Sequence, residues 1–238
     1  MVGIIKSSNF YDLNVHSQPD FADSPNRMVL EAKKLGYYGI CFSSINSGNV
    51  IISPDISTSL TTNFHVYAGI EIQVDNVSKM KKNVARLREK ADIIIISGGS
   101  EEINRAALEE GKIDILTHST SRGSPLNHIL AKAASDNGVA LDFNPNAIIM
   151  QKGGTRIKIL SALRKNVQLA RKYDVPMIMT SNAKSHYDLR RPREMMALGM
   201  IMGMTQNEAL QALSSIPQAV IKRNLDGNRI MDGVEVLE

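Results

Sequence analysis

The chain has 238 residues, a length that suits one α/β barrel or two smaller domains. Its hydrophobic content of 43% and charged content of 22% are those of a globular protein and exclude a disordered chain. The net charge is +4, and the single cysteine excludes an internal disulfide. Every apolar run is shorter than the roughly 18 residues of a membrane span. We therefore expect a cytoplasmic protein that makes no membrane contact.

Short apolar runs alternate with helical patterns in the first half of the chain. Strand-like runs cover residues 11–16, 39–42, 64–72 and 92–96, and helical patterns cover 24–36, 74–91 and 101–110. The run at 92–96 is apolar on both faces, which is typical of a buried parallel strand. Residues 47–63 are rich in Ser, Thr, Asn and Pro and predict a long loop, within which only 50–52 resembles a strand.

The same alternation continues to the end of the chain. Further strands are predicted at 113–117, 139–143, 175–179 and 233–237, and further helices at 124–138, 155–173, 191–203 and 205–214. The first of these helices would begin at Ser124-Pro125. Its apolar positions have helical spacing and are expected to face the core: Leu126, Ile129, Leu130, Ala133 and Ala134.

Strands that alternate with helices imply parallel strands joined by right-handed crossovers. Seven strands and a terminal eighth at 233–237 therefore predict an α/β fold, a TIM-type (β/α) barrel formed by one domain over residues 1–238. No helix is evident between the second and third strands, so we expect an irregular barrel.

Polar side chains follow several of the predicted strands, where the mouth of such a barrel lies. They are Asp12, Asn14, His16, Glu71, His118, Asn144 and Asn182. Because residues alternate along a strand, Asp12, Asn14 and His16 are expected to share one face. Converging His, Glu and Asp side chains could hold metal ions that activate water; alternatively, these groups only hydrogen-bond to the loops.

Four of these segments resemble motifs of the polymerase and histidinol phosphatase (PHP) superfamily. The segments are Asp12-Leu13-Asn14-Val15-His16-Ser17, Gly69-Ile70-Glu71, Leu116-Thr117-His118 and Thr180-Ser181-Asn182-Ala183-Lys184. The resemblance implies a PHP-like barrel. Asn14, Asn182 and Lys184 stand where that superfamily has metal ligands, and a neutral amide or an ammonium group binds a cation poorly. We therefore expect a vestigial site without metal.

Five further segments are similar to the archaeal ribonuclease P protein component 3 family, whose eukaryotic homologue is the 30-kDa subunit. They are residues 10–15, 103–107, 142–145, 163–176 and 229–235. The resemblance implies a protein subunit of ribonuclease P, the endoribonuclease that removes the 5′ leader from precursor tRNA. It also implies that the RNA subunit is the catalyst and uses magnesium, so this chain would bind no cofactor itself. The alternative is a metal-dependent phosphoesterase of the PHP type.

The family resemblance also implies partners. They are the ribonuclease P RNA, a small ferredoxin-like protein subunit, the other ribonuclease P proteins and, through the holoenzyme, precursor tRNA. Positive charge is concentrated where an RNA partner would need it, because residues 151–193 hold 11 Lys and Arg against 2 Asp and Glu.

Seven basic residues lie in or beside loops that follow predicted strands five to seven, so we expect them on one rim of the barrel. They are Arg122, Lys152, Arg156, Lys184, Arg190, Arg191 and Arg193. Arg105 and Arg164 are further candidate RNA contacts, although Arg105 has helical spacing to Glu101 and Glu109 and could pair with either. Lys158, Lys165 and Lys172 form an outer stripe that favours a solvated helix face.

Overall fold

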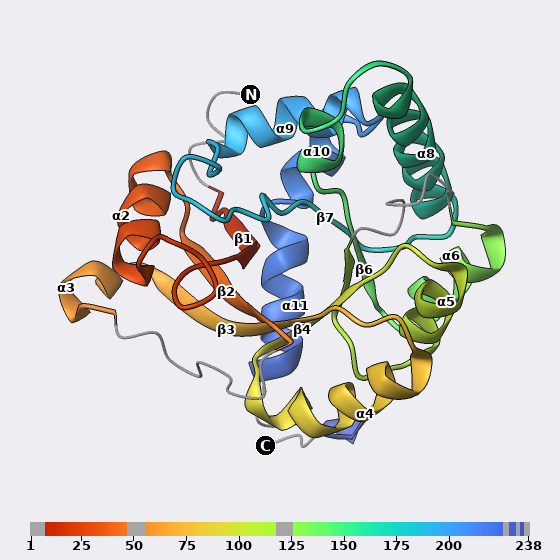
Figure 1. Cartoon of the computed structure of the whole chain (residues 1–238), viewed down its shortest axis with the longest axis horizontal. Coiled ribbons are helices and arrows are strands. Elements are labelled where there is room, and N and C mark those ends of the chain that lie inside the picture. Colours follow the sequence, from red (N-terminus) through yellow and green to blue (C-terminus); the bar gives the residue numbers. More distant parts are fainter. Residues whose placement is uncertain (1–7, 47–55, 118–125, 226–228, 232–233, 236–238) are drawn as a thin grey trace.

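A curled sheet of seven parallel strands forms the centre of the molecule (Figure 1). The computed structural model describes residues 8–46, 56–117, 126–225, 229–231 and 234–235. Strand neighbours follow chain order: β1 (Tyr11–Val15), β2 (Gly39–Ile45), β3 (His65–Ile72), β4 (Ile93–Ser97), β5 (Ile115–Thr117), β6 (Ala140–Asp142) and β7 (Met177–Ile178). The predicted irregular TIM-type α/β fold is confirmed.

Helices surround the sheet. They are α2 (Pro25–Leu35), α3 (Thr58–Thr61), α4 (Val77–Leu87) with the 3-10 turn η1 (Arg88–Lys90), α5 (Glu101–Glu109), α6 (His128–Asp136), α7 (Asn146–Ile149), α8 (Gly153–Lys172), α9 (Pro192–Ile201), α10 (Gln206–Gln211) and α11 (Ser215–Leu225). Local signals fix several of their ends. The Ser24 side chain accepts a hydrogen bond from the Arg27 N–H at the start of α2, and Gly36 ends that helix with φ +97°.

Two local predictions are wrong. Part of the loop expected at 47–63 is the short helix α3; residues 47–55, including the strand-like run at 50–52, lie outside the described residues. The helix after β5 begins at His128, not at Ser124, because the Asn127 side chain accepts from the Leu130 N–H and caps it there. Leu126, Leu130 and Ala134 are buried as predicted, whereas Ile129 is exposed and Ala131 is buried in its place.

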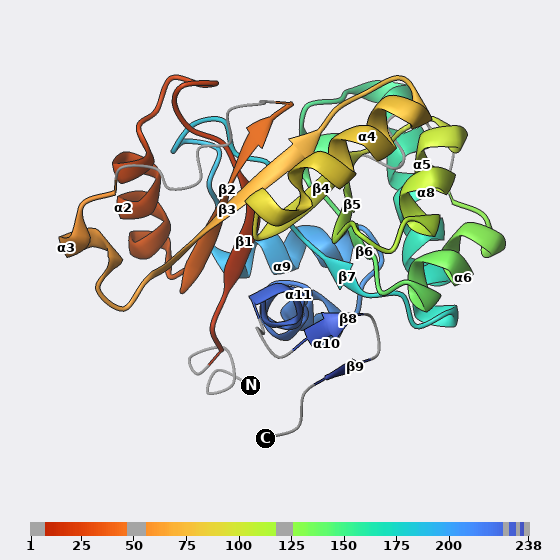
Figure 2. The same ribbon diagram turned by 90° about the horizontal axis from the view of Figure 1, so that it is seen from below.

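The described part of the predicted eighth strand lies outside the barrel sheet. Residues Val234–Glu235 form β9, which pairs antiparallel with β8 (Arg229–Met231) in a separate two-stranded sheet. At the two edges of the main sheet, backbone groups bond to residues 212–213 and not to an eighth strand. The N–H of Tyr11 donates to Leu213 O at 2.9 Å, and the N–H of Met179 donates to Ala212 O at 3.0 Å. Helix α11 then lies across the N-terminal ends of the strands (Figure 2).

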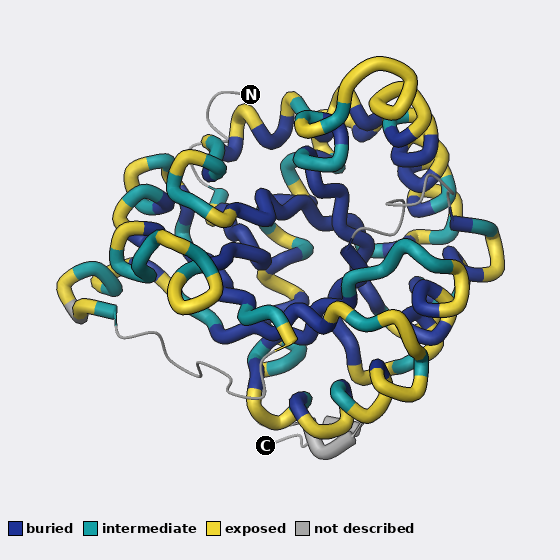
Figure 3. Tube along the Cα trace, viewed as in Figure 1, coloured by how far each residue is buried: buried dark blue, intermediate teal, exposed yellow. Residues whose placement is uncertain are grey.

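The strands are buried on both faces (Figure 3). Ile94 and Ile96 of β4 pack in the layer shared with the outer helices, whereas Ile93 and Ile95 pack inside the barrel with Val220 of α11. Cys41 lies in this inner layer and is fully buried, as expected of a small apolar side chain. Among the described helices, none has the length and apolar character needed to span a membrane.

Candidate functional site

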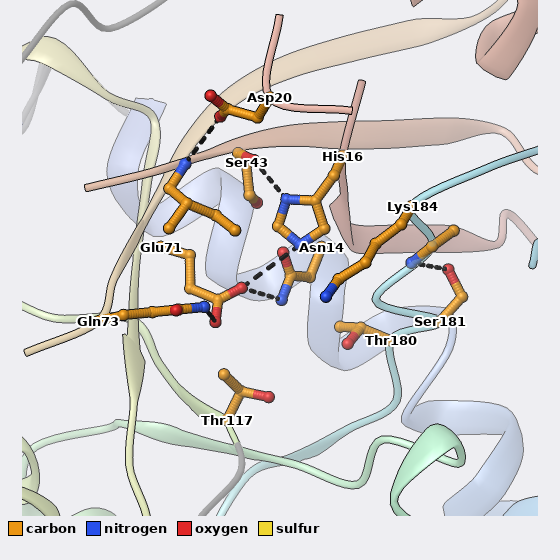
Figure 4. Close-up of polar contacts among 12 residues, drawn as sticks. Asn14, His16, Asp20, Ser43, Glu71, Gln73, Thr117, Thr180, Ser181 and Lys184 are labelled. Carbon is orange, nitrogen blue, oxygen red and sulfur yellow. Dashed lines mark hydrogen bonds and ion pairs between the residues drawn. The ribbon is translucent and has the colours of Figure 1, made fainter. Parts of the chain in front are cut away.

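The mouth of the barrel holds a buried polar cluster centred on Glu71, at the end of β3 (Figure 4). Asn14 Nδ2 donates to Glu71 Oε2 at 3.1 Å, and Gln73 Nε2 donates to Glu71 Oε1 at 2.8 Å. His16 Nε2 lies 3.5 Å from Glu71 Oε2, while its Nδ1 lies 2.6 Å from Ser43 O. The backbone of β2 thus orients the imidazole toward the carboxylate.

The Glu71 cluster, which we define as Glu71, Asn14, His16 and Gln73, keeps its carboxylate charged. Burial alone would raise the pKa of Glu71, but the contacts from His16, Asn14 and Gln73 together lower it to about 2. Asn14, His16 and Glu71 are each at most 1% exposed. The lowered pKa means that Glu71 carries its charge at neutral pH although it is buried.

A second buried carboxylate, Asp142, lies at the end of β6. Thr117 Oγ1 donates to its Oδ2 at 2.6 Å, Thr180 Oγ1 donates to the same atom at 2.9 Å, and the Thr180 N–H donates to Oδ1 at 3.0 Å. Burial raises the pKa of Asp142 to about 7, because these neutral donors compensate only part of the missing hydration and the nearby Asp12 raises it further.

Asp12 does not share the face of Asn14 and His16, which corrects the sequence prediction. The pairing of β1 with β2 is irregular between Asp12 and Val15, so strict alternation fails there. Asp12 instead accepts from the backbone N–H groups of Asn14 at 3.3 Å and of Ser181 at 3.1 Å. Its carboxylate therefore ties β1 to the segment after β7.

The mouth does not fit the metal cluster of a PHP enzyme. Asn14 and His16 already contact Glu71, and the side chain of Lys184 extends toward Asn14 (Figure 4). Asn182 has φ +47°, a backbone conformation that asparagine tolerates better than most residues. In the part of the chain that the structure describes, no group of three His, Cys, Asp or Glu could hold a metal ion; His118 lies outside that part.

The predicted basic rim is only partly assembled at the mouth. Lys152 and Arg156 are exposed at the start of α8, after β6, and Lys184 is exposed after β7. Arg156 also supports this turn, since its Nε donates to Gln151 O at 2.6 Å. Arg122 lies outside the described residues.

Arg190, Arg191 and Arg193 are not on the mouth rim. The chain after β7 rises to the strand ends and then descends to α9, which lies nearer the level of α11 (Figure 2). Consistently, Tyr37, which comes just before β2, donates its hydroxyl to Arg190 O at 2.9 Å. These three arginines therefore form a flank group near the N-terminal ends of the strands.

Arg105 and Arg164 have intramolecular partners. Arg105 Nη2 lies 3.7 Å from Glu101 Oε1, one of the two pairings that the sequence left open. Arg105 also lines a hollow with the three carboxylates of Asp75, Glu101 and Glu102, which makes that side of the mouth unfavourable for phosphate. Arg164 Nε donates to Ile201 O at 3.2 Å and joins α8 to α9.

Sequence reasoning missed a cluster beside the mouth that joins Asp23 and Arg27 to His186 and Tyr187. His186 Nδ1 lies 2.8 Å from Asp23 Oδ2, and Arg27 Nη2 lies 2.9 Å from His186 Nε2. About 160 residues separate the two segments, so no local spacing could reveal the contact. The available sequence signal was an aromatic residue, Tyr187, within the basic segment 151–193.

The sequence comparisons identify one family. The family model described as RNase P subunit p30 matches residues 9–228. A ribonuclease P protein component 3 from Methanococcoides burtonii is 41% identical over 97% of this chain and 95% of the relative. Another from Methanosarcina mazei is 41% identical over 96% of each chain.

Solved structures support the fold. The chain superposes on a chain of an archaeal ribonuclease P with mature tRNA at a TM-score of 0.77 and 23% identity, covering 96% of this chain and 98% of that one. It also resembles a Lactococcus lactis histidinol phosphate phosphatase complexed with zinc, L-histidinol and phosphate, at a TM-score of 0.51 and 14% identity over 91% and 94% of the two chains. Both superpositions show a shared α/β barrel fold.

Proposed function

The chain belongs to the RNase P subunit p30 family, and from this premise we propose that it is a non-catalytic, RNA-binding subunit of ribonuclease P. The observation that carries the proposal is the family match over residues 9–228. The holoenzyme would remove the 5′ leader of precursor tRNA, with magnesium held by its RNA. The ferredoxin-like subunit and the other ribonuclease P proteins would be the protein partners.

The side chains at the barrel mouth support the proposal that this chain is not itself a catalyst. A PHP phosphoesterase needs several ligands around metal ions, whereas here Asn14 donates to Glu71 and Lys184 brings an ammonium group to the mouth. The chain would then contribute by binding and positioning RNA. A direct test measures hydrolysis of a generic phosphoester with manganese or zinc. Activity that His16→Ala abolishes would overturn this part of the proposal.

The basic side of the mouth supplies charges that suit an RNA backbone. Lys152, Arg156 and Lys184, which we call the mouth set, follow the neighbouring strands β6 and β7 and are exposed. Lysine and arginine that neutralise phosphates release condensed counterions, and binding becomes weaker as salt rises. Arg122 and Arg164 remain candidate contacts outside this set, whereas the carboxylates around Arg105 disfavour a phosphate contact there.

Three matched groups of three cations test where RNA binds. Alanine replaces the mouth set, the flank group (Arg190, Arg191 and Arg193), or the outer stripe of α8 (Lys158, Lys165 and Lys172), so each variant loses the same charge. Each variant is reconstituted with the ribonuclease P RNA and its protein partners, and precursor-tRNA cleavage and RNA affinity are measured at several salt concentrations.

We expect the mouth-set variant to lose the most cleavage stimulation and to lower the log–log salt slope by roughly two units, about 0.7–0.9 for each phosphate that the chain no longer neutralises. The outer-stripe variant should change little. Equal losses of cleavage and affinity in all three variants would contradict an RNA-binding surface centred on the mouth. If the flank-group variant loses the most, the RNA binds at the side of the barrel instead. No effect of the whole chain on cleavage would overturn the proposed function.

A further inference from the structure

We propose that Tyr187 and His186 form a stacking platform for one unpaired RNA base beside the barrel mouth, an inference that rests on the proposed RNA-binding function. Tyr187 is 81% exposed, the largest exposed fraction among the large apolar side chains of the described residues. Its ring centroid lies 3.9 Å from that of His186, with 39° between the two planes. One face of the tyrosine thus packs on the imidazole, and the rest of the ring is open to a ligand.

Hydrogen bonds fix the histidine half of the platform. Asp23 Oδ2 accepts from the His186 N–H at 2.7 Å, lies 2.8 Å from His186 Nδ1 and accepts from the Ser185 hydroxyl at 2.7 Å. These contacts, chiefly the side-chain bond from His186, lower the pKa of Asp23 to about 2. Arg27 holds the same ring, since its Nη2 lies 2.9 Å from His186 Nε2 and its Nε donates to His186 Nδ1 at 3.2 Å.

The backbone that carries Tyr187 is also held in place. The N–H groups of Lys184 and Ser185 both donate to Asp188 Oδ2 at 3.1 Å, which closes a tight turn around the tyrosine. A side chain that is already ordered loses little conformational entropy when a ligand stacks on it. The backbone beneath the exposed ring is therefore fixed, and the ring itself packs on His186.

Positive charge next to the platform favours a nucleotide over an apolar peptide. Arg27 is exposed and contacts His186 directly. The neighbouring carboxylates of Asp23 and Asp188 accept hydrogen bonds from residues 184–186, so their bonded oxygens face that segment. A base on Tyr187 would place its phosphate next to Arg27.

The chain contains no tryptophan, so Tyr187→Trp introduces a unique fluorescent reporter at the platform. The probes are an oligouridylate of about ten nucleotides and a ribose-phosphate chain of the same length without bases. We expect the oligouridylate to quench the reporter and the abasic chain to leave it unchanged, because only a base can stack.

Affinity measurements on the full chain separate stacking from charge. Tyr187→Ala should weaken oligouridylate binding about tenfold without changing the salt slope, and Tyr187→Phe should restore it, since stacking on one ring is worth about 1–3 kcal/mol. Leu225→Ala is the matched control, because Leu225 is 52% exposed on α11 at the opposite end of the barrel. Circular dichroism of each variant confirms that it is folded.

The outcomes distinguish this inference from the proposed function. If Tyr187→Ala binds oligouridylate as the unaltered chain does while the mouth-set variant is weakened, RNA binding stands and the platform is wrong. If Tyr187→Ala instead loses affinity for a protein subunit, Tyr187 belongs to a protein interface and the inference is overturned. If the unaltered chain binds neither probe at low salt, the proposed RNA-binding function fails as well.

Discussion

The two halves of the barrel mouth treat a buried carboxylate in opposite ways. On the β1–β3 side, Glu71 is held by two amide donors and the His16 imidazole, and its pKa falls to about 2. On the β5–β7 side, Asp142 meets two hydroxyls and one backbone N–H, and its pKa rises to about 7. The side chain near a carboxylate therefore decides whether burial leaves it charged, and only the Glu71 half carries a fixed negative charge at neutral pH.

The largest effect is expected from Glu71→Ala. The substitution leaves Asn14 Nδ2 buried without its acceptor and removes the carboxylate that lies 3.5 Å from the buried His16 ring, so the free energy of unfolding should fall by about 3 kcal/mol at neutral pH. Urea denaturation measures the decrease. Glu71→Gln retains the volume and one acceptor oxygen and should cost about half as much. A Glu71→Ala chain as stable as the unaltered protein would show that the Glu71 cluster does not act as a unit.

The stability that Asp142 contributes should fall as the pH rises, and Asp142→Asn tests this dependence. In the native state Asp142 stays protonated up to a pKa of about 7, whereas in the unfolded chain it ionises near its ordinary value of 3.8. The stability contributed by the protonated carboxyl is therefore complete below pH 3.8 and is lost as the pH rises to about 7. Asp142→Asn cannot ionise, so its unfolding free energy should fall much less over this range.

The measurement is urea denaturation at several pH values between about 4 and 8. Exposed Asp136→Asn on α6 controls for the removal of one acidic group. Some slope should remain in Asp142→Asn, because burial also raises the pKa of Asp12 to about 6. Identical pH profiles for Asp142→Asn and the unaltered chain would contradict the difference between the two halves.

Local sequence signals predicted most of the fold. Ser24, Pro25 and Gly36 define α2 because capping depends on residues a few positions apart. The isoleucines of β4 predicted a strand buried on both faces, and the helix patterns located α4, α5 and α8 to within a few residues. Each of these features is determined by neighbours in the sequence, so spacing alone could reveal it.

Features that depend on distant contacts were not predictable in this way. The edges of β1 and β7 bond to residues 212–213, which leaves no position for an eighth strand. The irregularity in β1 separates Asp12 from Asn14 and His16, although strict alternation places all three on one face. The chain between β7 and α9 likewise runs back toward the N-terminal ends of the strands, so Arg190 lies away from the mouth. No local sequence pattern predicts this path.

The smallest effect is expected from Gln73→Ala, which probes the outer edge of the Glu71 cluster. Gln73 is exposed, so water can replace its amide at Glu71 Oε1, and the unfolding free energy should fall by only about 1 kcal/mol at neutral pH.

Because the pKa of Glu71 lies below its ordinary value of 4.5, the stability it contributes is present above pH 4.5 and is lost as the pH falls to about 2. The cost of Gln73→Ala should therefore shrink over that acidic range. A double-mutant cycle with Glu71→Gln isolates the interaction. Strict additivity of the two substitutions would show that the amide does not support the buried charge and that the Glu71 half depends on Asn14 and His16 alone.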